Sequence, residues 1–392
     1  MPATCDAFTI RFTPPLRRLE SSPAAPLAGL TVGVKDNFDI AGAITGSGNP
    51  EYAADHPPAR ETALVVDRLL DAGAIITGKT QMDELAYSLM GLNARYGAPL
   101  NPAAPDRAPG GSSSGSAVAT ASGQVEIGLG TDTGGSVRLP ASFCGLFGWR
   151  SSHGLIPATG LVPLAPSYDT TGFFTRDLAT MRRVMTLFTA SVPKPETFDI
   201  WLPADLWAVS TLGSTTFPRL ARPNFNPRQD PILPAGGSAA CLDAFRLHQG
   251  YEIWQIFGDW ITRRQPDFGP GIRERFAMAS KITSEQFQQA ATYRQSLRAH
   301  LAARMRPNTI LIYPTAPGPA PSLTVPPPAL EIYRNRSLSL MALAGHAGLP
   351  QLSLPLGQQE GAPIGLSLVA SAGYDILLAD AAAHLFPPDR ED

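Results

Sequence analysis

The chain has 392 residues, of which 44% are hydrophobic and only 16% are charged, and its formal net charge is −2. This composition predicts a large buried core and offers no basic stripe for a nucleic acid or an anionic membrane surface. No run of about 18 apolar residues occurs, and the N-terminus lacks a basic stretch followed by an apolar core, so we expect a cytoplasmic protein without a membrane span.

The first elements alternate between strand and helix. Residues 30–35 form a short apolar pattern that predicts a strand ending at Lys35. Apolar residues at helical spacing predict a helix over 60–72, and residues 74–78 then predict a strand. A further helix is expected over 81–89. This order is typical of an α/β protein.

Lys35 is the candidate base of the chain. An apolar strand would carry its ammonium group into the interior, where burial favours the uncharged amine. A neutral lysine can accept a proton at neutral pH. The alternative is an ordinary solvent-exposed ion pair with Asp36 or Asp39. The six histidines are weaker candidates, because none lies in a setting that marks a catalytic base.

Between Pro109 and Arg138 the chain consists almost entirely of small residues, with two serine clusters. The small residues before Ser136 let the backbone approach a substrate and point N–H groups at one spot, as an oxyanion hole requires. A serine hydroxyl becomes a good nucleophile only when a base takes its proton. Ser112 and Ser136 are therefore candidates for one proton relay toward Lys35.

The elements around these serines place them at the edge of a sheet. We expect a helix over 116–122, a strand over 126–130 that leads to the Ser136 loop, and a helix after Arg138.

Two other motifs compete for the first serine cluster. Residues 111–115 match the G-x-S-x-G nucleophile elbow, but the prolines at 105 and 109 do not suit the strand that such an elbow needs. A phosphate-binding loop is also disfavoured, because no lysine follows in the Walker arrangement and no G-x-G-x-x-G opens a βαβ unit.

The second half of the chain predicts mainly helices, then strands. Helices are expected over 178–188, 242–264 and within 272–305, strands over 309–313, 351–355 and 363–368, and helices over 337–347 and 375–385. Residues 212–238 are rich in Pro, Gly, Asn and Thr and predict a surface loop, and a proline-rich connection follows the strand at 309–313. The aromatic residues of 242–264 are interpreted as core.

Three cysteines, Cys5, Cys144 and Cys241, are too few and too scattered for a disulfide framework or a zinc site. Cys144 lies in an apolar run and is interpreted as a packed side chain rather than a second nucleophile. We expect no metal and no cofactor.

Three motifs together resemble the amidase signature family of serine hydrolases. They are Gly33-Val34-Lys35-Asp36, Gly110-Gly111-Ser112-Ser113 and the run from Gly130 to Arg138, and they are intact and in the family's order. The resemblance is close over residues 28–180 and looser over 309–320 and 334–380. Residues 82–88 and 101–109 look most like the short plant-type amidases that hydrolyse indole-3-acetamide, and the amidase-like domain of a chloroplast import receptor has similar segments.

This resemblance implies roles for particular residues. Ser136 would be the nucleophile, Ser112 a cis-configured relay and Lys35 the base. The backbone amides of the loop, those of Thr133, Gly134, Gly135 and Ser136, would form the oxyanion hole, and Asp132 and Arg138 would brace the loop. The implied fold is a single α/β domain over 1–392, with a mixed central β-sheet and helices on both faces.

The implied activity is hydrolysis of a small-molecule amide, a primary aryl or arylalkyl amide such as indole-3-acetamide, to the acid and ammonia through an acyl-enzyme. Met82, Tyr87 and Phe143 line an apolar pocket in one interpretation and belong to the core in the other. The alternatives are a glutaminase-type subunit of a transamidating complex and a non-catalytic amidase-like binding module. We expect a monomer or a homodimer.

Overall fold

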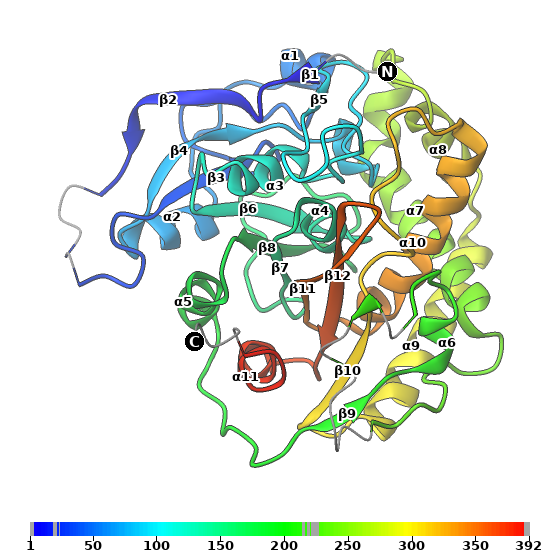
Figure 1. The fold of residues 1–392 in the computed structure, drawn as a ribbon. Coiled ribbons are helices and arrows are strands. Elements are labelled where there is room, and N and C mark those ends of the chain that lie inside the picture. Colours follow the sequence, from blue (N-terminus) through cyan, green and yellow to red (C-terminus); the bar gives the residue numbers. More distant parts are fainter. Residues whose placement is uncertain are drawn as a thin grey trace.

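A computed structural model describes residues 4–18, 22, 24–213, 216–217, 220 and 227–387. Among these residues, one ten-stranded sheet in the order β2-β4-β3-β6-β8-β7-β11-β12-β10-β9 runs through the molecule (Figure 1). The strands are β2 (Phe8–Leu16), β3 (Thr31–Lys35), β4 (Ile75–Thr80), β6 (Ile127–Asp132), β7 (Phe147–Arg150), β8 (Thr170–Thr175), β9 (Asp199–Trp201), β10 (Thr309–Pro314), β11 (Gln351–Gln359) and β12 (Ala362–Val369). A second, two-stranded sheet joins β1 (Thr4–Cys5) to β5 (Ala98–Pro99).

The large sheet is mixed. Strand β3 is parallel to both β4 and β6, whereas β8 is antiparallel to β6 and to β7. Because the carboxyl ends of parallel strands meet at the same edge, the ends of β3 and β6 are neighbours. The predicted α/β fold with a mixed central sheet is confirmed.

Helices cover both faces of the sheet (Figure 1). They are α1 (Pro50–Asp55), α2 (Leu64–Asp71), α3 (Ser114–Ala121), α4 (Arg138–Cys144), α5 (Leu178–Phe188), α6 (Ala204–Trp207), α7 (Gly237–Arg264), α8 (Ile272–Ala279), α9 (Ser284–Arg304), α10 (Pro327–Ala347) and α11 (Asp375–Leu385). Adjacent strand residues point to opposite faces. Accordingly, Phe173 packs in one core cluster with α2, α5 and α11, while Phe174 packs in another with α3 and α4.

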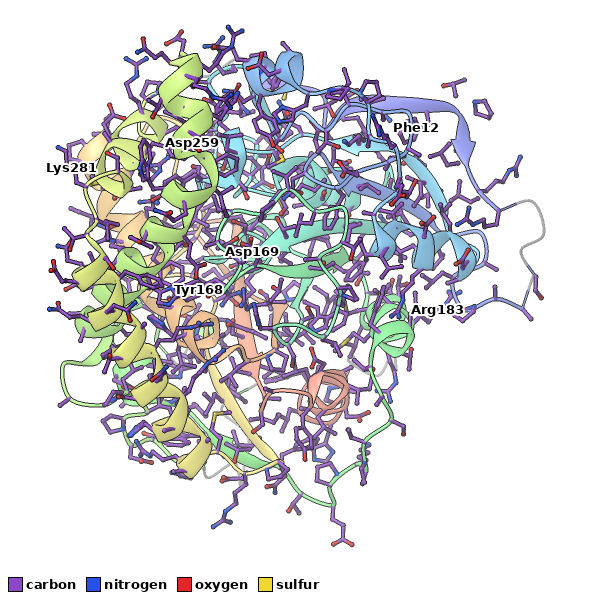
Figure 2. All side chains as sticks on the ribbon, turned by 180° about the vertical axis from the view of Figure 1, so that it is seen from behind. Phe12, Tyr168, Asp169, Arg183, Asp259 and Lys281 are labelled. Atoms are coloured by element: carbon purple, nitrogen blue, oxygen red, sulfur yellow. The ribbon has the colours of Figure 1, made fainter. Side chains whose placement is uncertain are left out.

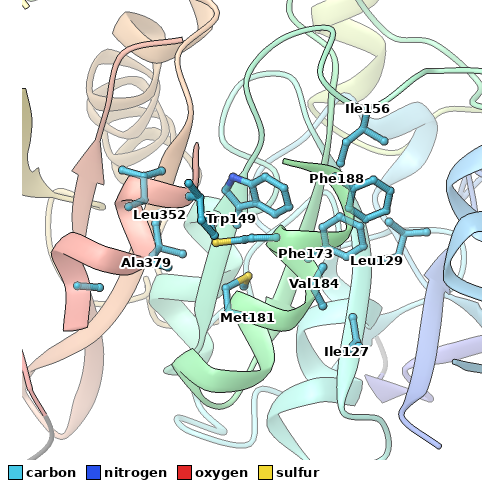
Figure 3. Packing of buried hydrophobic residues seen from close by; sticks show 14 of the residues in the cluster. Ile127, Leu129, Trp149, Ile156, Phe173, Met181, Val184, Phe188, Leu352 and Ala379 are labelled. Carbon is cyan, nitrogen blue, oxygen red and sulfur yellow. The ribbon is translucent and has the colours of Figure 1, made fainter. Parts of the chain in front are cut away.

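The first of these clusters is a continuous apolar layer under α5 and α11 (Figure 3). The Phe173 ring stacks on Trp149 at 5.8 Å and on Phe188 at 5.5 Å between ring centroids. Burying large aromatic side chains stabilises a fold by about 1.5–3 kcal/mol each, so this layer fixes the central strands β6, β7 and β8 on which the site is built.

Helices α5 and α11 have the predicted bounds, but the helix expected over 81–89 was wrong. Only a single 3-10 turn, η1 (Glu84–Ala86), forms there. Leu85 and Ala86 have φ angles of +47° and +58°, which no α-helix contains. The carboxylates of Asp83 and Glu84 are buried and accept backbone N–H groups of Gly91 and Gly269, so tertiary contacts override the local pattern.

Two helices begin earlier than predicted. Helix α10 begins at Pro327, inside the predicted proline-rich connection, because proline is tolerated in the first turn of a helix. Helix α7 begins at Gly237, so the predicted loop over 212–238 extends two residues into it. Residues 214–215, 218–219 and 221–226 of that loop lie outside the described residues.

Among the described residues, no helix is long and apolar enough to cross a membrane. Organisation of the chain as one domain stays a prediction.

Candidate active site

Lys35 ends strand β3 and is fully buried. Strand β3 lies between β4 and β6, so neither of its edges is open to solvent, and α3 packs against it. The Lys35 Nζ atom lies 2.7 Å from Ser112 Oγ and 2.7 Å from Thr131 Oγ1 at the end of β6. The structure therefore brings the predicted base and the predicted relay into direct contact.

Burial lowers the pKa of Lys35 to about 7, against the opposing attraction of Asp83, Asp132 and Asp169. A large fraction of this side chain is thus the uncharged amine at neutral pH. The solvent-exposed pair with Asp36 does not form. Asp36 pairs instead with Lys79 at 2.9 Å, and both side chains are buried.

The Gly111–Ser112 peptide is cis, and Ser112 is fully buried. The Ser112 carbonyl accepts the N–H of Asp83 at 3.1 Å, and the Asp83 carboxylate accepts the N–H of Gly91 at 3.0 Å. A Cβ atom at Gly111 would lie 2.0 Å from that carboxylate, so only glycine fits there. Asp83 thus holds the segment that carries Ser112.

The Ser136 loop folds around the carboxylate of Asp132, the last residue of β6. Its two oxygens accept the N–H of Gly135 at 2.9 Å and the N–H of Val137 at 3.1 Å. Gly135 has a φ of +117°, a backbone conformation that glycine adopts readily and other residues rarely adopt. Arg138 donates to both oxygens of Asp132, at 2.7 and 2.9 Å, so the two predicted braces bind one another under the loop.

Arg150 is a second cation on Asp132 that the sequence analysis missed. Its guanidinium lies 3.0 Å from the Asp132 carboxylate and donates to the carbonyl of Tyr168 at 2.9 Å. Together, Arg138 and Arg150 hold the pKa of Asp132 well below its usual range, although burial opposes them. Asp132 is therefore a charged, fully paired anchor.

The amides of the Ser136 loop differ in their partners. The N–H of Gly135 is occupied by Asp132, whereas within the described ranges no protein acceptor takes the N–H of Gly134 or Ser136. The Thr133 hydroxyl donates to Asp169 at 2.6 Å. Figure 2 shows Asp169 and Tyr168 in the middle of the molecule, and Tyr168 packs against Phe245 of α7 at 4.9 Å.

The two serine segments are adjacent, since the N–H of Ser113 donates to the carbonyl of Ser136 at 3.3 Å. Cys144 is buried, its thiol lies 3.3 Å from the carbonyl of Pro109, and burial raises its pKa. Its interpretation as a packed side chain is confirmed. Among the described residues no group of His, Cys, Asp and Glu side chains could hold a metal ion.

A narrow cleft of about 20 Å³ opens beside Ser136, little more than one water molecule needs. It is lined by Ala86, Tyr87, Ser88, Leu89, Thr133, Gly134, Ser136, Leu164, Gln249, Arg334 and Leu338. An adjacent cavity of about 350 Å³ shares four of these residues: Tyr87, Gln249, Arg334 and Leu338. The cleft beside Ser136 and this cavity are therefore neighbours, and residues of α7 and α10 line both.

Of the three candidate substrate-binding residues, Tyr87 lines both spaces. Met82 and Phe143 are fully buried in the core cluster beside them. The sequence analysis did not identify Gln249 and Arg334 as lining residues. Each lies on a helix far from the serine motifs in the sequence, and neither belongs to a recognisable motif.

Comparison with known proteins relates the chain to amidases and amidase-like proteins. The family model named Amidase matches residues 15–215 and 226–378. Amidase 1 of Arabidopsis thaliana is 39% identical over 406 residues, which cover 94% of this chain and 95% of that protein. The chloroplastic outer envelope protein 64 of the same plant is 34% identical over 409 residues, which cover 96% of this chain and 69% of that protein. A solved structure described as an amidase superimposes with a TM-score of 0.79 and 30% identity over 91% of this chain and 83% of its own.

Proposed function

The chain belongs to the amidase family and is an amidase, and from this premise we propose that it hydrolyses a primary aryl or arylalkyl amide, such as indole-3-acetamide, to the acid and ammonia. The observation that carries the proposal is the 2.7 Å contact between the buried Lys35 amine and the Ser112 hydroxyl, in a fold that also presents Ser136 at the substrate cleft.

In the proposed reaction, Ser136 Oγ attacks the carboxamide carbon. Its proton passes to Ser112, and Ser112 passes its own proton to the uncharged amine of Lys35. This relay needs a base whose pKa lies near the working pH, and the pKa of Lys35 of about 7 meets that condition. Removal of a proton-transfer group of this kind costs roughly a hundredfold to ten-thousandfold in rate.

The oxyanion formed by the attack needs fixed N–H donors. Thr133, Gly134 and Ser136 are proposed as the donors. Gly135 contributes the bend of the loop, since its own N–H bonds to Asp132. Asp132 and Arg138 are proposed to keep these amides in place by holding the loop from beneath.

The second half of the reaction reverses the relay. The protonated Lys35 returns a proton through Ser112 to the leaving nitrogen, and ammonia departs. Water then attacks the acyl carbon while Ser112 and Lys35 take its proton; the ester bond to Ser136 breaks, the relay returns the proton to Ser136 Oγ, and the acid leaves. No cofactor enters any step.

The aryl or arylalkyl character of the substrate is supported by apolar residues beside Ser136 and by the adjacent cavity of about 350 Å³, since the cleft alone has room for little more than a water molecule. Tyr87, Leu164 and Leu338 place apolar surface next to Ser136. The choice of an indolyl acyl group is based on the resemblance of residues 82–88 and 101–109 to plant-type amidases. A cytoplasmic location and a monomeric or homodimeric state stay predictions.

The test is ammonia release by the purified chain from a panel of aliphatic, aryl and indolyl primary amides. We expect turnover that is faster for the aryl and indolyl amides than for the aliphatic ones, and none with Ser136→Ala. Uniform inactivity across the panel would favour the alternative of a non-catalytic binding module. Turnover of glutamine alone would favour a glutaminase-type subunit.

A further inference from the structure

Three arginines from three helices line the cavity that adjoins the Ser136 cleft. Arg246 comes from α7, Arg275 from α8 and Arg334 from α10. The cavity measures about 350 Å³, and Arg334 also lines the cleft beside Ser136. A molecule that extends from Ser136 into this cavity would therefore lie against Arg334 in both spaces.

The positive charge of this cavity is poorly balanced. Glu331 is the one carboxylate of its lining, and it accepts from Arg334 at 3.2 Å with 52% of its side chain exposed. The other two arginines donate to neutral groups: Arg275 to the carbonyl of Tyr87 at 2.8 Å and Arg246 to the amide oxygen of Asn335. Glu331 also attracts Arg246 and Arg275, more strongly than Asp243 attracts Arg246 or the buried Asp83 attracts Arg275, but none of these carboxylates forms a direct ion pair with either arginine among the described residues.

Arg334 is the least satisfied of the three. Its side chain is only 11% exposed, and its Nε–H is buried with no acceptor in the part of the chain that the structure describes. A buried donor without a partner costs about 1–3 kcal/mol. Burial, with the neighbouring charge of Arg334, lowers the pKa of Arg275 to about 10 and also lowers that of Arg246. A guanidinium group keeps its charge at neutral pH, so three of them make the cavity favour an anion.

We propose that this cavity binds a carboxylate on the acyl part of the substrate, so that among aryl and arylalkyl amides those with a carboxylate at the end remote from the amide group are preferred over uncharged ones such as indole-3-acetamide. This inference rests on the proposed amidase reaction at Ser136. A guanidinium presents paired N–H donors that match a carboxylate in two parallel hydrogen bonds, and Arg334 has its Nε–H free to make one of them.

The surface between the two ends suits an apolar spacer. Tyr87 and Leu338 line both the cleft and the cavity, so the middle of a bound molecule lies against a ring and an aliphatic side chain. An aryl or arylalkyl spacer with an amide at one end and a carboxylate at the other satisfies the cleft, the apolar passage and the arginines together.

The test compares two substrates of similar shape, 4-carboxyphenylacetamide and 4-methylphenylacetamide, by kcat/KM for ammonia release. The wild type should prefer the carboxylate by at least about tenfold, the value of one charge-assisted hydrogen bond. Arg334→Gln should abolish most of that preference, mainly through KM, and Arg246→Gln should reduce it. Arg336→Gln, at an exposed position on the same helix, is the matched control and should keep it.

Equal kcat/KM for both substrates in the wild type, or a preference that survives both Arg334→Gln and Arg246→Gln, would overturn the inference while leaving the amidase reaction intact. If neither amide is hydrolysed, the proposed substrate class is wrong. The carboxylate subsite is then tested by a binding measurement instead of by kinetics. Equilibrium dialysis of 4-carboxyphenylacetate should show about tenfold weaker binding to Arg334→Gln than to the wild type. Equal binding would contradict the subsite. Arg246→Gln serves if Arg334→Gln does not fold.

Discussion

The Nζ atom of Lys35 lies 2.7 Å from the Oγ atom of Ser112, although 77 residues separate them in the chain. The contact forms because β3 ends at Lys35 and the Ser112 segment lies against the same edge of the sheet, where Asp83 holds it. Neither residue is exposed to solvent. Because both groups are enclosed, a proton can pass from the hydroxyl to the amine without exchanging with bulk water.

The two serines should differ in the size of their effects. Ser136→Ala removes the attacking oxygen and should leave almost no turnover. Ser112→Ala removes only the relay and should lower kcat by at least about a hundredfold. Steady-state ammonia release measures both. Ser113→Ala, a neighbouring buried serine without a place in the relay, is the control, and a Ser112→Ala enzyme as active as that control would refute the relay.

The pH dependence follows from the pKa of Lys35, about 7. The base must be uncharged to accept a proton, so activity should be full above this pKa and fall as the pH drops through it. The fall should reach about tenfold per pH unit on the acid side. The profile of kcat/KM from about pH 9 to about pH 5 measures it. A flat profile through neutral pH would exclude Lys35 as the titrating base.

Asp83 should influence the pH at which activity falls on the acid side of the profile, here called the acid limb. Its carboxylate attracts the Lys35 ammonium and so raises the lysine pKa, against the larger effect of burial. Asp83→Asn keeps an acceptor for the Gly91 N–H but removes the charge, so the limb should move to lower pH. Glu84→Gln changes an adjacent buried carboxyl that does not act on Lys35 and should leave the limb in place. A limb unmoved in Asp83→Asn would show that the carboxylate has no such influence.

Loss of the Asp132 charge should destabilise the fold. Asp132→Asn would leave Arg138 and Arg150 buried without a counterion, and breaking a buried ion pair costs about 3–5 kcal/mol. Urea denaturation measures the free energy of unfolding. Asp6→Asn, which breaks the exposed pair with Arg11, should cost less than about 1 kcal/mol. Similar small losses in both variants would contradict the anchoring role.

Local patterns predicted much of this fold. Helix α5 has the predicted bounds because its apolar residues are periodic and Asp177 caps its first turn, accepting the N–H of Thr180. The burial of Lys35 was predictable because the short segment before it, residues 30–34, has no charged residue and is mainly apolar.

Contacts between distant elements were not predictable. Lys79 pairs with Asp36 only after β4 is placed beside β3, and Arg150 pairs with Asp132 only after β6 and β7 are placed on either side of β8. The prediction of a helix over 81–89 was wrong for the same reason. The buried carboxylates of that segment accept N–H groups of distant loops, whose positions cannot be predicted from the sequence. The position of Arg334 beside the cleft could not be predicted, because it depends on which cavity α10 faces.

The most direct test of the account is the kcat for ammonia release by Lys35→Ala, measured above pH 7 on the best amide of the panel. The account predicts a loss of at least about a hundredfold with the fold intact, because the hydroxyl of Ser112 then has no base to receive its proton. Turnover close to that of the wild type would show that the proton of Ser136 leaves by another route.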